Sequence, residues 1–193
     1  MTTAPHGLSK GLAACVVQDA EGREQTVGAL CAGRAVLLLF VRHFGCIGCA
    51  ENIGLLAPRF QELAVLGVRI LIIGCGAPMF IEGFRERHLL LHTPAEVYVD
   101  ETLATHRAAE LSYGHWGGFG PRGLLEMGRA FVRGHVPNGT QGDTKQQAGA
   151  LLVDAGGTVR LHHQNRSLGD HVSGSLLVEE SMKMVLRANP SVV

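Results

Sequence analysis

Two cysteines stand three positions apart directly after an apolar run, and this pair is the strongest chemical signal in the sequence. Cys46 and Cys49 form a Cys-x-x-Cys pair that follows the segment 35–41, AVLLLFV. A helical pattern begins at the pair, so Cys46 is predicted at a helix N-terminus, beside free backbone N–H groups and the positive end of the helix dipole. Such donors stabilise a thiolate and lower the pKa of a thiol from its free value of about 8.5. Arg42 and His43 stand just upstream and could add positive charge.

The spacing of the pair predicts different tasks for the two thiols. Cys46 is expected to be the nucleophile, and Cys49, one helical turn along, is placed to attack an adduct on Cys46 and close a disulfide. Gly45 and Gly48 have no side chains that could obstruct access to either cysteine. These features predict redox chemistry.

Two other uses of the pair compete with the redox interpretation. A structural zinc site needs about four ligands. The sequence has no second Cys-x-x-Cys, although His43, His162 and His163 could complete a site. Buried packing is possible for any single cysteine. The strand–turn–helix context favours redox chemistry over both.

The remaining cysteines are assigned separately. Cys15 and Cys31 are expected to be small buried residues, one in a strand and one in an apolar loop. Cys75 ends a predicted strand parallel to 35–41, so it should emerge at the same sheet edge as Cys46. A packed thiol is favoured there, with a third redox-active thiol as the alternative.

The apolar patterns predict alternating strands and helices, followed by a hairpin and a last helix. Pro58 predicts a kink or a break in the first long helix. His162 and His163 fall at the end of an edge strand, where solvated histidine is expected. The Gly-rich stretch 112–148 is the least readable, with a possible helix at 124–131 and a loop in which His115, Trp116 and Phe119 could line a pocket. The expected strands are 12–17, 35–41, 68–73, 96–99, 150–154 and 158–162, and the expected helices are 47–66, 78–87, 101–111 and 176–187.

This order predicts a single α/β domain over residues 1–193, a thioredoxin-like sandwich in which a mixed β-sheet carries helices on both faces. Seventeen basic residues balance seventeen acidic ones, so neither nucleic acid nor a membrane surface is expected as a partner. No run reaches the roughly 18 apolar residues of a spanning helix. Residues 1–8 lack the pattern of a signal peptide. An odd cysteine count of five fits a reducing cytoplasm better than a secreted disulfide framework.

Several segments resemble the peroxiredoxin-like 2 family, and together they extend over about residues 8–185. The resemblance implies a thioredoxin-fold enzyme related to the AhpC/TSA peroxiredoxins, with Cys46 as nucleophile and Cys49 as resolving thiol. It also implies reduction of a peroxide or endoperoxide O–O bond, with electrons from thioredoxin or another external dithiol, supplied indirectly by NADPH. No motif in the sequence requires a metal or a tightly bound cofactor such as haem or flavin. The matching segments are Leu38–Cys49 (LLFVRHFGCIGC), 67–76, 97–101, 141–154 and 161–171.

The sequence departs from the pattern of the true peroxiredoxins at three positions. That pattern reads Pro-x-x-x-Thr-x-x-Cys, and here Leu39 and His43 stand where it has Pro and Thr. Typical members also carry an Arg where this chain has Ala148-Gly149. Arg42 is the candidate to replace the lost charge.

We therefore expect a thiol-dependent reductase that acts on a small oxidant. The alternatives are a protein thiol–disulfide oxidoreductase and a non-catalytic redox sensor or metal-binding module. A deep pocket at Cys46 would favour a small substrate, and an exposed apolar rim would favour a protein.

Overall fold

The computed structural model describes residues 6–114, 125, 128–130, 132, 143 and 145–188. In this part of the chain, eight strands form one mixed sheet in the order β1-β8-β7-β4-β5-β6-β2-β3. The strands are β1 (His6–Gly7), β2 (Val16–Gln18), β3 (Glu24–Thr26), β4 (Ala35–Phe40), β5 (Val68–Gly74), β6 (Ala95–Val99), β7 (Gly149–Val153) and β8 (Thr158–Gln164). The α-helices are α1 (Lys10–Ala14), α2 (Val27–Cys31), α3 (Ile47–Val65), α4 (Ile81–Arg87), α5 (Ala104–Ala108) and α8 (Gly174–Ala188), and the short 3₁₀ helices are η1 (Pro78–Phe80) and η2 (Leu90–His92).

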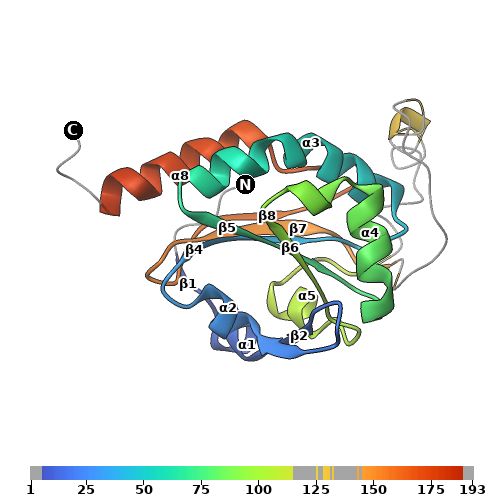
Figure 1. Ribbon diagram of the computed structural model, residues 1–193, viewed down its shortest axis with the longest axis horizontal. Coiled ribbons are helices and arrows are strands. Elements are labelled where there is room, and N and C mark those ends of the chain that lie inside the picture. The colour runs from blue at the N-terminus through green and yellow to red at the C-terminus, as the bar shows by residue number, and fades with distance from the viewer. Residues whose placement is uncertain are drawn as a thin grey trace.

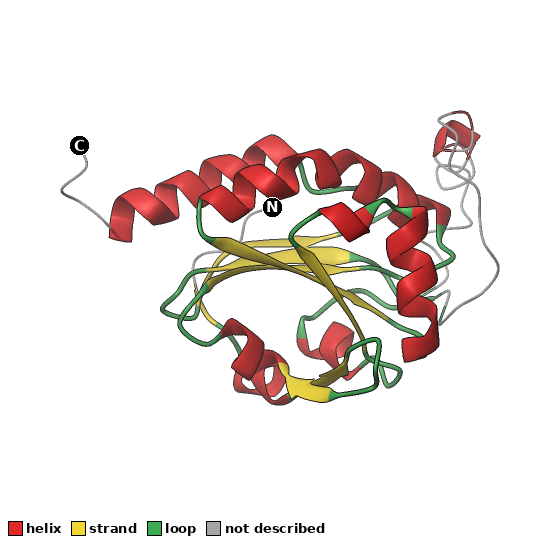
Figure 2. Ribbon diagram, viewed as in Figure 1, coloured by secondary structure: helices red, strands yellow, loops and turns green. Residues whose placement is uncertain are grey.

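Strand β4 lies at the centre of the sheet because its side chains are apolar on both faces. It pairs in parallel with β5 and antiparallel with β7. Leu37 and Leu39 belong to the core under α3, α4 and α8, whereas Leu38 and Phe40 belong to the core on the side of α1, α2 and α5. Figure 1 shows these two helix layers on opposite faces of the sheet, and Figure 2 shows the strands between them. The predicted mixed sheet with helices on both faces is confirmed.

Helix α3 runs unbroken from Ile47 to Val65 with Pro58 inside it, so the predicted possibility of two helices is wrong. Proline removes one N–H and leaves the carbonyl of the residue four positions earlier without a helical partner. That residue is Gly54, and both Gly54 and Pro58 are exposed. Water can therefore bond the freed carbonyl, and the helix continues.

The predicted strand at 12–17 is wrong in its first half. The Leu12 N–H donates to the Ser9 hydroxyl at 3.1 Å, which caps a short helix α1 (Lys10–Ala14), and only then does β2 begin. The buried side chain of Leu12 fits either a strand or a helix, so the cap decides between them.

Two cysteines near this end of the chain differ from their predictions. Cys15, the residue after α1, is half-exposed rather than buried, and its thiol donates to the Gly11 carbonyl at 3.2 Å. Cys31 is buried as predicted, but it ends helix α2 instead of lying in a loop.

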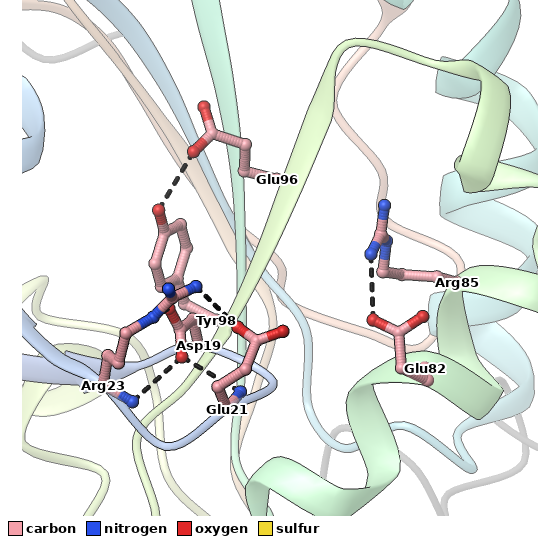
Figure 3. Close-up of polar contacts among 7 residues, drawn as sticks. All are labelled: Asp19, Glu21, Arg23, Glu82, Arg85, Glu96 and Tyr98. Atoms are coloured by element: carbon pink, nitrogen blue, oxygen red, sulfur yellow. Dashed lines mark hydrogen bonds and ion pairs between the residues drawn. The ribbon is translucent and has the colours of Figure 1, made fainter.

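The far edge of the sheet is held by polar contacts at its surface (Figure 3). Asp19 accepts hydrogen bonds from the backbone and side chain of Arg23, which also contacts Glu21, and this closes the β2–β3 turn. On β6, the Tyr98 hydroxyl donates to Glu96 at 3.0 Å. The ion pairs of Arg23 with Asp19 and Glu21 involve an exposed arginine and contribute little free energy, so they shape the β2–β3 turn rather than stabilise the fold.

The other predicted elements agree with the structure where it describes them. The strands at 68–73 and 96–99, the hairpin at 150–162 and the helices at 78–87 and 176–187 are confirmed, although η1 forms the first turn of the 78–87 segment. The helix predicted at 101–111 is shorter, Ala104–Ala108. The loop containing His115, Trp116 and Phe119 lies outside the described residues. Four of the eight residues of the possible helix at 124–131, namely 125 and 128–130, are described, and these are helical. No described helix is long and apolar enough to cross a membrane.

Candidate active site

Cys46 is the residue that caps the N-terminus of α3, at the end of the loop that follows β4. Its backbone is extended (φ −75°, ψ 123°), and it makes no side-chain cap bond of its own. The backbone N–H groups of Gly48 and Cys49, in the first turn of α3, help to lower the pKa of the Cys46 thiol. The structure thus places Cys46 beside the free donors of a helix N-terminus, as the sequence predicted.

The surroundings of Cys46 favour its thiolate. The pKa of Cys46 is lowered to about 6, first by a hydrogen bond from the Cys49 thiol and then by the positive charge of Arg42 and the helix N–H groups. Burial acts in the opposite direction, and the residue is only 7% exposed. A thiolate of this kind is the nucleophilic form of cysteine at neutral pH.

Cys49 has the opposite character. Its pKa is raised well above the ordinary value, first by burial and then by the hydrogen bond and charge of Cys46. The Arg42 backbone N–H donates to the Cys49 sulfur at 3.1 Å. Both cysteines are free thiols in this structure. The arrangement therefore holds one thiolate and one protonated thiol within one helical turn.

Arg42 and His43 differ in what they contribute to the site. The charge of Arg42 lowers the pKa of Cys46. His43 is buried, and its pKa is lowered to about 4, first by burial and then by the charge of Arg42. His43 is therefore neutral at pH 7, and the predicted positive charge from this residue is wrong.

Cys75 emerges at the same sheet edge as Cys46, as predicted. Its thiol donates to the Arg42 carbonyl, and its sulfur accepts the Asp143 N–H at 3.1 Å. Burial is the first cause that raises its pKa to about 11. Cys75 is therefore a packed thiol that joins the loop after β4 to Asp143.

A buried histidine that the sequence analysis did not single out holds the loop from below. His106 on α5 has no exposed surface. Its Nε2–H donates to the Val41 carbonyl at 3.0 Å, and its Nδ1 lies 3.3 Å from the Thr105 hydroxyl, which is its donor. Burial lowers the pKa of His106 to about 4. The neutral ring therefore holds the backbone of Val41, the residue directly before Arg42, by a hydrogen bond.

Gly48 is required by a close approach to the loop after β8. A Cβ at this position would lie 2.7 Å from both the carbonyl oxygen and Cγ of Leu168. The glycine thus lets the first turn of α3 pack against that loop, and the loop covers Cys49 from one side.

Behind Cys49 lies a buried polar group that the sequence analysis also missed. Glu51 and His171 have side chains that are 2% and 8% exposed, and His171 Nε2 lies 3.3 Å from the Glu51 carboxylate. Cys49 and His171 both line a cavity of about 10 Å³, as do Asn52 and Gln147. Residues 51 and 171 are 120 positions apart in the chain, so no local pattern connects them.

The alternative metal ligands are not assembled around the pair. His162 is buried on β8 rather than solvated, and its pKa is lowered chiefly by burial. His163 is half-buried, with Nε2 3.3 Å from the Asp170 carbonyl. Among the described residues, no group of three or more His, Cys, Asp or Glu side chains is placed to hold a metal ion.

A large cleft formed by described residues lies at the other end of the sheet. It measures about 770 Å³ and contains none of the predicted site residues. Its walls come from the start of β4, the C-terminal ends of α3 and α8, and the β7–β8 turn.

The sequence of this chain is similar to a known family and to curated relatives. The family described as AhpC/TSA antioxidant enzyme matches residues 55–167, so this match begins after the cysteine pair. Peroxiredoxin-like 2C of Mus musculus is 32% identical over 179 residues, which cover 85% of this chain and 76% of that protein. Peroxiredoxin-like 2C of Homo sapiens is 31% identical over 189 residues, covering 89% and 81%.

Solved structures agree with the fold. The peroxiredoxin 6 structure of Arenicola marina has a TM-score of 0.68 at 10% identity, covering 94% of this chain and 74% of that one. Reduced Prx3 of Vibrio vulnificus in complex with hydrogen peroxide has a TM-score of 0.64 at 15% identity, covering 91% and 98%. These likenesses show a thioredoxin-like peroxiredoxin fold, and the sequence matches show that the chain belongs to the peroxiredoxin-like 2 family of AhpC/TSA-related proteins.

Proposed function

We propose that this chain is a thiol-dependent reductase of a peroxide, endoperoxide or similar small oxidant, with Cys46 as nucleophile and Cys49 as resolving thiol. Membership of an antioxidant-enzyme family supports thiol-based redox chemistry in general. The single observation that carries the specific assignment is the position of Cys46 at the N-terminus of α3 with Cys49 one turn along. This arrangement lowers the pKa of Cys46 and raises that of Cys49.

The reaction begins at the Cys46 thiolate. Its sulfur attacks one oxygen of the O–O bond, the bond breaks, and the other oxygen leaves as an alkoxide or hydroxide that takes a proton. With a hydroperoxide, Cys46 is now a sulfenic acid and the oxidant has been reduced by two electrons. With an endoperoxide, the attacked oxygen stays bonded to carbon, so Cys46 carries the substrate as a sulfenate ester. The Cys49 sulfur then attacks the Cys46 sulfur and forms the Cys46–Cys49 disulfide. The displaced oxygen leaves as water from the sulfenic acid, or as the alcohol product from the sulfenate ester.

An external dithiol returns the pair to the reduced state. One thiolate of the dithiol attacks the disulfide, and its second thiol completes the exchange and leaves as an oxidised pair. We assign this role to thioredoxin or a similar protein, recharged from NADPH by its own reductase, and place the cycle in the cytoplasm. The cycle as written needs no tightly bound cofactor.

The burial of Cys46 favours a small oxidant over a protein disulfide. With the residue 7% exposed, a small molecule needs a smaller opening to reach the sulfur than a folded protein does. Arg42 supplies positive charge at the site, whereas His43, in the position of the peroxiredoxin Thr, is neutral and buried. We therefore assign Arg42 the stabilisation of the negative charge on the leaving oxygen.

The test is NADPH consumption coupled through thioredoxin and its reductase, with hydrogen peroxide, an alkyl hydroperoxide and an oxidised dithiol as separate oxidants. We expect turnover with a peroxide that disappears in Cys46→Ser and is strongly reduced in Cys49→Ser. Cys15→Ser is the matched control, because this half-exposed thiol caps α1 away from the pair.

Turnover with the oxidised dithiol alone would contradict the proposal in favour of protein thiol exchange. No turnover with any oxidant, in protein shown to be reduced and free of metal, would contradict it in favour of a redox sensor.

A further inference from the structure

The cavity behind Cys49 has the size and the lining of a site for one water molecule. Its volume of about 10 Å³ is about one probe sphere, which is what a single water needs. A water also needs two to four polar partners. Asn52 Oδ1, both amide atoms of Gln147 and His171 Nδ1 are buried and have no hydrogen-bond partner among the described residues. These three side chains and Cys49 all line the cavity.

His171 lines this cavity, and the ring nitrogen that does not contact Glu51 is buried without a hydrogen-bond partner among the described residues. A carboxylate can only accept, so Nε2–H donates to Glu51 and Nδ1 carries the lone pair. The charged groups around His171 are Glu51 on α3, Arg129, whose guanidinium lies 3.5 Å from the Glu51 carboxylate, and the neighbouring Asp170. Burial lowers the pKa of His171 against the pull of Glu51, so the ring is a neutral base at pH 7.

We propose that Glu51, His171 and one water molecule form a buried proton relay for the resolving cysteine. This inference rests on the proposed function and adds a route for the proton of Cys49, which is 3% exposed. In the reduced protein the Cys49 thiol donates to the Cys46 sulfur. Once Cys46 is oxidised, that thiolate acceptor is gone, and the Cys49 proton is available to the cavity.

The relay acts in both halves of the cycle, and its protons balance. As the S–S bond forms, the Cys49 proton passes to the water, and the water passes a proton to His171 Nδ1. The hydroxide that leaves Cys46 takes its proton from solvent. The imidazolium is held by the Glu51 carboxylate while the disulfide exists. When a dithiol cleaves the disulfide at Cys46, Cys49 leaves as a thiolate and recovers the proton from His171 through the same water.

Glu51 and His171 are positioning and proton-transfer residues that never touch the oxidant, so the test separates the two steps. Reduced protein is mixed with hydrogen peroxide and, separately, with oxidised glutathione. Cys46 modification and Cys46–Cys49 disulfide formation are each followed by mass spectrometry of quenched samples between pH 5 and 9. Oxidised glutathione makes a mixed disulfide on Cys46, so the step that follows is measured even where peroxide does not react.

In His171→Asn we expect modification of Cys46 at the wild-type rate and disulfide formation slowed about 100-fold at pH 7, the scale of general acid–base catalysis. In this variant the rate of disulfide formation should rise with hydroxide concentration over the whole pH range. In wild type the rate should instead reach a plateau above the pKa of His171. Gln147→Met keeps His171 and Glu51 but removes both amide partners of the water, and it should slow the same step. His92→Asn, an exposed histidine on η2, is the matched control.

Equal disulfide-forming rates and pH profiles in His171→Asn, Gln147→Met and His92→Asn would overturn the relay. A parallel loss of Cys46 modification in His171→Asn, at every pH, would also overturn it, because that result marks a structural role. If wild-type Cys46 reacts with oxidised glutathione but not with hydrogen peroxide, the proposed function is contradicted. The relay is then tested by the rates of disulfide formation measured with oxidised glutathione.

Discussion

The two ends of strand β4 differ in what they offer a ligand. The start of the strand opens onto a cleft of about 770 Å³ with Arg34 and Arg187 at its walls. The end of the strand leads into Cys46 and Cys49, which are 7% and 3% exposed, and to a cavity of about 10 Å³. Every sequence-predicted reactive residue lies at the second, nearly closed end.

This contrast shows that the volume of a cleft does not locate the chemistry. At the thiol end, parallel strands β4 and β5 finish beside a helix N-terminus, and burial strengthens each interaction with the Cys46 thiolate. At the cleft end, the helices finish with their C-termini, whose dipoles disfavour a thiolate or any other anion. Exclusion of water and the direction of the helix dipole therefore separate the two ends.

The substitution with the largest expected effect, and the one that most sharply distinguishes the two ends of β4, is the replacement of Cys46. We expect Cys46→Ser to remove peroxide-dependent turnover because an alcohol of this kind is not ionised at neutral pH. The coupled NADPH assay measures it, and residual turnover equal to that of Cys15→Ser would place the chemistry elsewhere.

A second prediction concerns the buried neutral histidine under the thiol end. The pKa of His106 falls from 6.5 to about 4 on folding. The stability that comes from keeping this ring neutral is therefore fully present above pH 6.5, and it is lost as the pH falls toward 4. The loss in free energy of unfolding is about 3 kcal/mol. Denaturant titrations of wild type and His106→Gln between pH 4 and 8 should show a flatter profile in the variant. Parallel profiles would show that His106 does not titrate in this way.

A third prediction tests how closely the thiol end is packed. Gly48→Ala places a methyl group 2.7 Å from the Leu168 carbonyl, and we expect a loss of about 1–3 kcal/mol in the free energy of unfolding. Gly83→Ala on the exposed side of α4 meets no atom within 4 Å and should gain up to about 1 kcal/mol from helix propensity. Chemical denaturation measures both, and equal stabilities would contradict the close approach of the loop after β8.

The smallest expected effect is at the other end of β4. Arg34→Ala and Arg187→Ala change exposed side chains at the large cleft, and we expect peroxide turnover within about twofold of wild type. A large fall in turnover would show that the cleft takes part in the reaction, and the distinction between the two ends would fail.

The parts of this molecule that the sequence predicted are those whose signals are local. The continuous apolar run of β4 and the cysteines at the first turn of α3 stand next to each other, so strand, turn and helix could all be read. The short helix α1 was misread because its apolar residues also fit a strand, and the Ser9 cap decides the outcome. The charge of His43 was misjudged because its burial depends on the whole fold.

The buried groups behind the cysteines could not be predicted in the same way. His171 reaches Glu51 from a loop 120 residues away, and His106 reaches Val41 from 65 residues away. Each histidine alone looks like any other histidine in the sequence, and only the sheet order brings it to the site. Their roles follow from burial and geometry rather than from spacing.

The most direct test of the central claim is the pKa of the Cys46 thiol. The ultraviolet absorbance of the thiolate would be followed against pH in wild type and in Cys46→Ser, and the difference assigned to Cys46. We predict a transition with a midpoint near 6. A midpoint near the free thiol value of about 8.5 would contradict the assignment of Cys46 as an activated nucleophile.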